Sequence, residues 1–417
     1  MRNTFDNLTD FYAYVLPLAA FFILISTAVT NTFLVIAAFI GFVICISKRE
    51  YLVLYERKIL LLCLTLFFVL VISYLYTTAS NLDVILSLKK YIKFIYIPFI
   101  YYYIKEYKNE NLVIKYFIYG STFILFLSYL KYFNVFDFNM LYEITSYIQF
   151  NYTKYNIIET KSVIFQNYII SGVIICFLCF INLIIGIKKK NIANYLISLF
   201  AFVYIIYMND SRTSYIIISL LSFIVFYKYF FKRKFIFYIA PILVASIIIY
   251  SPFSENLTKR ISVTTQDVVK IFNQDFDSSS GMRYGWILCG IKNVVDKPFT
   301  GYGVGSYKKS LSNCFDVKEA NLDKEFITNN PHNEFISLST QLGLGGLFLY
   351  ILFLYHLYVN SKSNTLAQGI FIIVLVSSIF NSAIYDNILG LFIVLLISIT
   401  HQLSVGYSMS IKKLYNN

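Results

Sequence analysis

The sequence predicts an all-α protein that crosses a membrane about twelve times. Of its 417 residues, 58% are hydrophobic and only 14% are charged, and the mean hydropathy is +0.66. Disordered chains have low hydrophobicity and high charge, so a disordered protein is excluded. A soluble domain carries roughly 25% charged residues, so a soluble globular protein is disfavoured. A membrane helix needs about 20 apolar residues, and the roughly 242 apolar residues present would supply twelve. The apolar runs are continuous rather than alternating, which argues against a β-barrel.

Twelve apolar segments follow one another along the chain. They lie at residues 11–29, 32–47, 59–77, 91–104, 116–133, 167–187, 195–208, 213–230, 235–250, 333–357, 369–385 and 388–405. The stretch from 11 to 47 is too long for one span, so we divide it at Thr30–Asn31. The short segments 91–104 and 195–208 are expected to be partly buried or to thin the bilayer locally. Residues 1–250 thus hold spans one to nine, and residues 333–417 hold spans ten to twelve.

The basic residues predict the orientation, because cytoplasmic loops carry an excess of lysine and arginine. With the N-terminus inside, 18 of the 35 basic residues fall at cytoplasmic span ends, and ten others lie in one long loop. We therefore expect both termini in the cytoplasm. We also expect no cleavable signal peptide, because the first apolar run leads directly into a second. A net charge of +13 would indicate nucleic acid in a soluble protein, but here topology explains it, and we expect no nucleic-acid partner.

Lys89, Lys90 and Lys93 form the one basic cluster that this orientation places at an outside end. These lysines either anchor the chain at the membrane interface or assist the binding of an anionic substrate. Both interpretations remain open at the level of the sequence.

Residues 251–332 are predicted to form an extracytoplasmic loop domain between spans nine and ten. Residues 251–331 contain no full-length apolar span, and they hold 19 of the 57 charged residues and the only tryptophan. Cys289 and Cys314 both lie in this loop. They form either a disulfide, if the compartment is oxidising, or two unpaired thiols.

His332 lies at the outside start of span ten, in the sequence Asn330-Pro331-His332-Asn333-Glu334. Proline suits the first turn of a helix, so the imidazole is expected at the membrane surface. An imidazole titrates near neutral pH and can act as a general base. The alternative is an interfacial polar cap without a chemical role.

Two arginines are candidates for anion binding. Arg212 follows Asp210 and opens a span at its outer end, where an unpaired cation costs a few kcal/mol. Either Asp210 neutralises it, or its forked guanidinium captures an anion such as phosphate. Arg283 lies with Trp286 in a segment whose apolar spacing predicts a short amphipathic helix on the membrane surface. Taken alone, Arg283 is better explained as a solvated cation.

Glycines mark two further positions. Gly301-Tyr302-Gly303-Val304-Gly305 predicts a tight turn, and Gly343, Gly345 and Gly346 in span ten predict close helix contact. The sequence contains neither an H-E-x-x-H metal motif nor a P-loop, so it offers no metal or nucleotide site of these kinds.

Four motifs, in this order and on one predicted side of the membrane, resemble the bacterial O-antigen ligase / O-antigen polymerase superfamily. They are Ser211-Arg212 at the start of a span, Arg283 with Trp286 in a long outside loop, Pro298 followed by Gly301-x-Gly303-x-Gly305, and Pro331-His332-Asn333-Glu334 followed by Gly343-x-Gly345-Gly346. The resemblance implies a membrane glycosyltransferase with a fold like that of the GT-C type, which works without metal or nucleotide cofactor. Such enzymes act at the outer face of the bacterial inner membrane.

The resemblance also implies substrates and residue roles. The donor is a glycan on undecaprenyl pyrophosphate, and the acceptor is lipid A–core for a ligase or another lipid-linked repeat for a polymerase. His332 would activate the acceptor hydroxyl, and Arg212 and Arg283 would neutralise the pyrophosphate. Arg260 competes for the role of second cation. The predicted substrate-binding residues are Arg260, Lys93, Trp286, Asn333 and Glu334.

Several interpretations compete with a ligase. The long loop and the His332 motif favour a ligase over a polymerase. A transporter or flippase typically has repeated halves and a binding site at mid-membrane, and neither feature is apparent here. A structural or assembly protein would tolerate conservative changes at His332.

Overall fold

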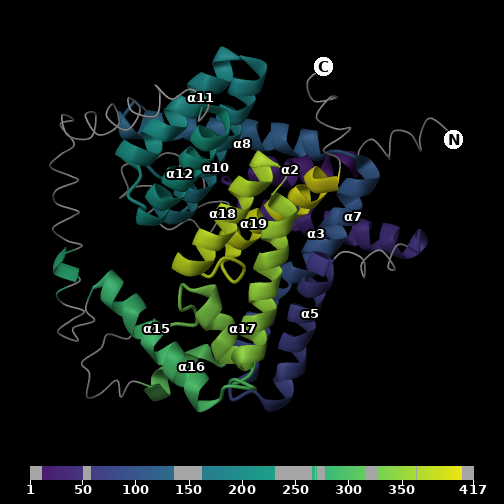
Figure 1. Ribbon diagram of the computed structural model, residues 1–417, viewed down its shortest axis with the longest axis vertical. Helices are drawn as coiled ribbons and strands as arrows, with labels where there is room; N and C mark the ends of the chain where they lie inside the picture. The colour runs from purple at the N-terminus through teal and green to yellow at the C-terminus, as the bar shows by residue number, and fades with distance from the viewer. Residues whose placement is uncertain are drawn as a thin grey trace.

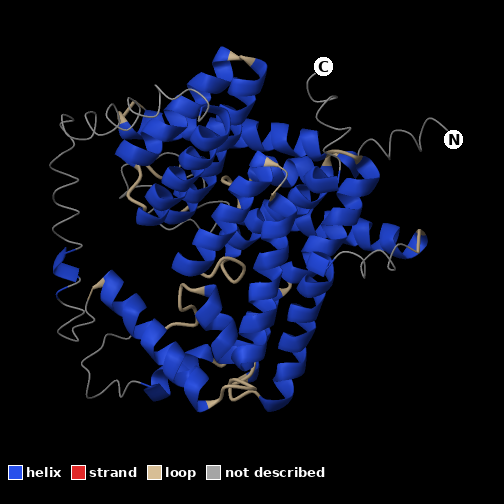
Figure 2. Cartoon of the chain, viewed as in Figure 1, coloured by secondary structure: helices blue, strands red, loops and turns tan. Residues whose placement is uncertain are grey.

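The computed structural model describes residues 12–49, 58–135, 162–230, 265–267, 269, 278–314, 327–362 and 364–405, without the side chains of Phe230, Ser279 and residues 401–405. All regular elements in these ranges are helices (Figure 2). Five of the described helical stretches are long and apolar enough to cross a membrane: Thr27–Ser47, Lys58–Tyr76, Glu110–Tyr132, Tyr168–Lys189 and Glu334–Ser361. The prediction of an all-α membrane protein is therefore confirmed. The count of twelve spans stays a prediction, and its ninth span at 235–250 lies outside the described residues.

The helices follow the predicted apolar segments closely. The first group is α2 (Val15–Phe22), α3 (Thr27–Ser47), α5 (Lys58–Ile72) with the one-turn η1 (Ser73–Tyr76), α6 (Asn81–Tyr91), α7 (Lys93–Tyr107) and α8 (Glu110–Tyr132). The second is α10 (Tyr168–Lys189), α11 (Ile192–Val203) with η3 (Tyr204–Met208), and α12 (Arg212–Val225) with η4 (Phe226–Phe230). The third is α15 (Ser279–Asp296), α16 (Tyr307–Cys314), α17 (Glu334–Ser361), α18 (Thr365–Phe380) and α19 (Asn387–Val405).

One large apolar core joins the helices from all three groups. Helix α3 packs on α7, α2 on α8, α11 and α12 on α10, and α5 on α17 (Figure 1). The apolar window of α10 is 83% buried, whereas those of α3 and α5 are 33% buried. Helix α10 is therefore an interior helix, and α3 and α5 expose most of their apolar surface, as expected for helices that face lipid.

The break between the first two apolar segments lies earlier than predicted. Helix α2 ends at Phe22, and α3 begins at Thr27, where the Ser26 hydroxyl accepts a hydrogen bond from the Val29 amide at 3.4 Å. Thr30 and Asn31 lie inside α3, so the division at these residues was wrong. The physical reason is the N-cap: a serine hydroxyl satisfies a free amide at a helix start, whereas threonine and asparagine are tolerated within a helix.

Helix α6 was not predicted, because it is too short and too polar to span a membrane. It begins at Ser80, whose hydroxyl accepts from the Asp83 amide at 3.2 Å. Its apolar side chains Leu82 and Ile85 are 66% and 62% exposed. This pattern fits a helix that lies at the membrane interface, and it places Lys89 and Lys90 in the last turn.

The predicted glycine turn packs against a kink in α17. The carbonyl groups of Thr340 and Gln341 accept from the amides of Tyr302 and Gly303 at 2.9 Å, and Pro298 accepts from the Leu344 amide at 2.7 Å. The kink is at Gly343, whose φ is +67°. Close contact at Gly343 is thus real, but the partner is a loop rather than a helix.

Gly345 does not make the predicted close contact, because a Cβ atom there would meet nothing within 4 Å. That prediction was wrong for Gly345. Gly346 is buried, and the atoms nearest to a Cβ atom there belong to Leu342 in the same helix, so its contact with another helix stays a prediction.

Gly343→Ala is expected to destabilise the protein, whereas Gly345→Ala is expected to leave it unchanged or slightly more stable. A Cβ at Gly343 would lie 2.5 Å from the Pro298 carbonyl oxygen in a left-handed conformation, which costs about 1–3 kcal/mol for strain alone. Gly345 lies in exposed helix, where alanine is favoured by about 1 kcal/mol. Thermal unfolding midpoints of the two purified variants should therefore move in opposite directions. Equal midpoints would show that the kink does not require glycine.

Helices α15 and α16 form a small unit beside the first half of α17 (Figure 1). A disulfide joins Cys289 to Cys314, with 5.9 Å between their Cα atoms, so the question left open by the sequence is answered in favour of the disulfide. Trp286, Tyr307 and Leu311 form its apolar core. This unit presents α15 to the start of α17, where His332 lies.

Candidate functional site

The backbone around His332 is held by side chains on both sides. His332 has a φ of +51°, a left-handed conformation that is unusual for a residue with a side chain. The Asn330 side-chain oxygen accepts from the His332 amide at 3.0 Å and also from the hydroxyl of Ser382. Asn333 caps α17 by accepting from the Ile336 amide and donates to the Ile379 carbonyl, both at 3.0 Å. Such over-determined strain is typical of functional positions.

The imidazole of His332 stacks on the indole of Trp286. The ring centroids are 5.5 Å apart and the planes differ by 28°. Trp286 is buried, and its carbonyl accepts from the Tyr307 hydroxyl at 3.1 Å, which anchors the indole. Burial, and then the charges of Arg283 and Lys90, lower the pKa of His332 to about 4. The imidazole is therefore neutral at pH 7 and can accept a proton.

Arg212 lies at the first position of α12 and meets a carboxylate from the segment that precedes α15. Ser211 caps the helix by accepting from the Ser214 amide at 3.2 Å. The Arg212 guanidinium donates to the Ser280 hydroxyl at 3.0 Å and lies 3.7 Å from an Asp267 oxygen. Ser280 in turn donates to Asp267 at 2.8 Å. The exposed guanidinium is thus oriented from one side and open on the other.

Arg283 interacts electrostatically with both Arg212 and His332. It is half-buried on α15, and burial lowers its guanidinium pKa; the charge of Arg212 lowers this pKa further, against an opposing contribution from Tyr168. Arg283 and Lys90 both act on His332, so two cations lie near one neutral imidazole, and Arg212 acts on Arg283 from its other side. Like charges gathered in this way are unfavourable unless an anion binds among them.

Glu334 is fully buried and supports the site from within. One carboxylate oxygen accepts from the amides of Ile384 and Tyr385 at 2.8 and 3.3 Å. Lys93 is also buried and donates to the carbonyls of Ile384 and Asp386. Both side chains thus hold the loop between α18 and α19.

Lys90 is the lysine of the basic cluster that faces the site. Its ammonium group lies 4.2 Å from the ring centroid of Tyr385, the residue whose amide Glu334 binds. Burial lowers the pKa of Lys90, and the nearby carboxylate of Asp386 opposes this shift. A cation–π contact of this kind holds the ammonium group in place without neutralising it.

A comparison with known families indicates the general class of the protein. Residues 197–351 match the O-antigen ligase family. This segment, which is less than half of the chain, is similar to O-antigen ligases. The resemblance to the O-antigen ligase / O-antigen polymerase superfamily is thereby confirmed, and with it the coarse class of a membrane glycosyltransferase that acts on lipid-linked glycans in lipopolysaccharide biosynthesis. No curated protein matches the chain.

The matched residues 197–351 include both arginines, Trp286 and His332. His332 stacks on Trp286 and interacts electrostatically with Arg283, which in turn interacts with Arg212. Asn333 caps α17 next to them. Lys93 and Glu334 are close in the fold but buried, so their contacts fit support of the neighbouring loop better than contact with substrate. Arg260 lies outside the described residues, and its predicted role stays a prediction.

Sequence reasoning missed Asp267, Ser280 and Tyr385, and it chose Lys93 over Lys90. Asp267 and Ser280 had no signal of their own, because their importance arises only when the loop folds onto α12. Lys90 could have been found if the end of α6 had been predicted. Among the described residues, no group of three histidine, cysteine or acidic side chains could hold a metal ion.

Proposed function

We propose that this chain is an O-antigen ligase, which transfers a glycan from undecaprenyl pyrophosphate to lipid A–core at the periplasmic face of the bacterial inner membrane. The observation that carries the proposal is the neutral imidazole of His332, which stacks on Trp286 and lies near two cations, Arg283 and Lys90, with Arg212 acting on Arg283. A neutral imidazole suits a general base, and the cations suit a diphosphate. The proposal includes the predicted topology, with both termini in the cytoplasm.

In the proposed reaction, His332 takes the proton from an acceptor hydroxyl as that oxygen bonds to the anomeric carbon of the donor sugar. The bond from this carbon to the diphosphate oxygen breaks, and its electron pair leaves with the diphosphate. Arg212 and Arg283 stabilise the negative charge that develops on the leaving group. Such electrostatic stabilisation of the transition state is usually the largest single contribution to catalysis. Bound diphosphate also counters the two cations that act on His332, so donor binding raises the pKa of the base toward neutrality.

The proposal is tested by deleting the gene in its own host and separating the surface lipopolysaccharide on a gel. Lipid A–core without polymer, together with accumulated lipid-linked polymer, is the expected result for a ligase. Core carrying a single repeat would instead identify a polymerase, the second candidate. An unchanged gel would overturn both. Complementation with the wild-type gene should restore the normal ladder, and complementation with His332→Ala should not.

Lys90→Met is expected to weaken donor binding and to change the pH profile, whereas Lys89→Met is expected to do neither. Lys89 is the exposed neighbour on α6 and serves as the matched control. Loss of the Lys90 charge removes one cause of the low pKa of His332, so His332 becomes protonated at a higher pH. The acid limb of kcat/KM should therefore move to higher pH, and the KM for donor should rise about tenfold, since a charged hydrogen bond contributes about 1.5–3 kcal/mol. Identical profiles for the two variants would exclude Lys90 from the site.

A further inference from the structure

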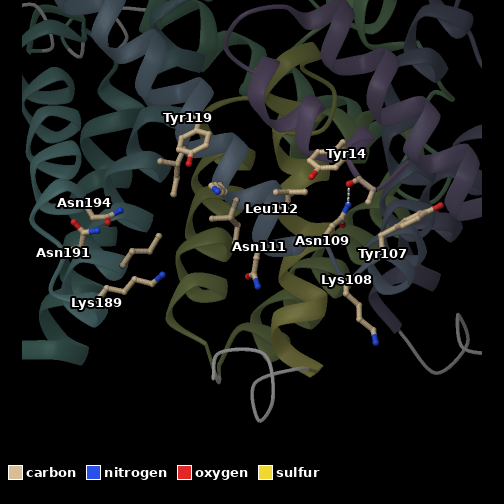
Figure 3. A pocket seen from close by; sticks show the side chains of 15 residues that line it. Tyr14, Tyr107, Lys108, Asn109, Asn111, Leu112, Tyr119, Lys189, Asn191 and Asn194 are labelled. Atoms are coloured by element: carbon tan, nitrogen blue, oxygen red, sulfur yellow. Dashed lines mark hydrogen bonds between the residues drawn. The ribbon is translucent and has the colours of Figure 1, made fainter. Parts of the chain in front are cut away.

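A cavity with a basic rim lies at the opposite end of the helices that lead away from the His332 site. It has a volume of about 840 Å³ and is bounded by the turn from α7 to α8 and the turn from α10 to α11 (Figure 3). Helix α7 begins at Lys93 beside the site, and α10 begins at Tyr168, which acts on Arg283. These helices have 15 and 22 residues, so at 1.5 Å per residue they separate the two places by about 20–30 Å. By the predicted topology, the cavity opens on the cytoplasmic side.

The cavity is basic. Lys108, Lys115 and Lys189 line it, and none of its fifteen lining residues is acidic. Two helices also begin there: Asn109 precedes α8, and Asn191 caps α11 by accepting from the Ala193 amide at 2.9 Å. Lysines and helix N-termini both attract anions.

Two side-chain oxygen atoms at the cavity have no hydrogen-bond donor among the described residues. Asn109 is 6% exposed, and its amide nitrogen donates to the Ala13 carbonyl at 2.6 Å, which fixes the orientation of the amide and leaves its oxygen unpartnered. The buried oxygen of Asn111, which lies near the middle of the view in Figure 3, is likewise unpartnered. Because a buried acceptor without a donor is unfavourable, a fitting ligand would supply donors as well as negative charge.

The remaining wall of the cavity is apolar. Leu112, Ile114, Ile118 and Ile185 line it together with the ring of Tyr119. In a chain with five candidate membrane spans, such a wall next to a basic rim matches the boundary between lipid chains and headgroups.

We propose that this cavity binds an anionic phospholipid of the cytoplasmic leaflet whose headgroup carries hydroxyl groups, as in phosphatidylglycerol. The lysines bind the phosphate, the headgroup hydroxyls donate to Asn109 and Asn111, and the acyl chains follow the apolar wall. An ethanolamine headgroup is disfavoured because its ammonium group would face three lysines, and a choline headgroup has no donor. The site is distinct from the His332 site, and the proposal does not depend on the transfer reaction.

The test measures lipid retained by the purified, delipidated full-length protein after exchange into micelles that contain phosphatidylglycerol or phosphatidylcholine, by native mass spectrometry. Wild type should retain phosphatidylglycerol preferentially. Each lysine near an anionic lipid contributes about fivefold, so the double variant Lys108→Gln, Lys189→Gln should lose roughly 25-fold. The control Lys188→Gln, Lys190→Gln removes two neighbouring lysines that do not line the cavity and should change retention less than twofold. Equal retention of both lipids by wild type, or equal losses in both double variants, would overturn the proposal.

A second measurement isolates the hydroxyl donors. Phosphatidylmethanol has the charge of phosphatidylglycerol but lacks its hydroxyls, so wild type should retain it roughly 25-fold less, in line with two hydrogen bonds of about 1 kcal/mol each. Asn111→Leu removes one of the two acceptors, so it should reduce this difference to about fivefold while still preferring either anionic lipid to phosphatidylcholine. This variant keeps all three lysines, so it tests the site even if the double variant fails to fold. Wild type that does not distinguish the two anionic lipids would refute the role of the asparagines.

Discussion

Replacing His332 by alanine is expected to lower glycan transfer by about 10²–10⁴-fold, the usual contribution of a general base. The imidazole is held neutral by burial, Arg283 and Lys90, and alanine can take no proton from the acceptor hydroxyl. The loss should appear in kcat at every pH, while the KM for donor changes little. Transfer is measured with purified protein in liposomes that contain donor and acceptor lipids.

His356 provides the matched control for this prediction. It lies on α17, which begins two residues after His332, near the opposite end of that helix. Its ring contacts the ring of Tyr355. His356→Ala should transfer glycan at the wild-type rate. Because His332→Ala removes the stack on Trp286, its thermal unfolding midpoint is measured as well, and we expect it to stay near that of wild type. A folded His332→Ala variant with more than a tenth of wild-type kcat would contradict the assignment of the base.

The helices and their order could largely be predicted from the sequence, because apolar runs of sufficient length leave few alternatives in a membrane. Apart from α6, which is too polar to appear as an apolar run, two exceptions share one cause. The break before α3 is set by the Ser26 cap, and the kink in α17 by the approach of Pro298 to Gly343. Both depend on single contacts that an average over an apolar window does not register.

The residues of the candidate site were likewise only partly predictable from the sequence. His332 and Arg212 were singled out because their side chains have a chemistry that a membrane surface makes costly, whereas the role of Arg283 was predicted only from the family resemblance. The choice of Lys93 over Lys90 depended on where α6 ends and α7 begins, between Tyr91 and Lys93. Asp267 and Ser280 lie more than 50 residues from Arg212 along the chain. A single sequence does not show which distant residues come into contact in the fold.

Arg283→Met is expected to lower kcat by about 10²–10³-fold, the cost of removing one fixed group that stabilises the developing charge. Arg212→Met should cost less, because Arg212 is exposed to solvent and lies 3.7 Å from Asp267, so its field at the leaving group is partly screened. Arg283→Lys should recover only part of the loss, since an ammonium group keeps the charge but not the forked geometry that matches a diphosphate. Lys292→Met, an exposed change on the same helix, is the control for net charge.

The pH profile of Arg283→Met distinguishes this role from a purely structural one. Arg283 lowers the pKa of His332, so its loss raises that pKa, and the acid limb of kcat/KM should move to higher pH. A structural defect would lower the rate by the same factor at every pH. If the profile of Arg283→Met is only scaled down and not displaced, the two residues do not share one site, and the proposed arrangement of base and cations is wrong.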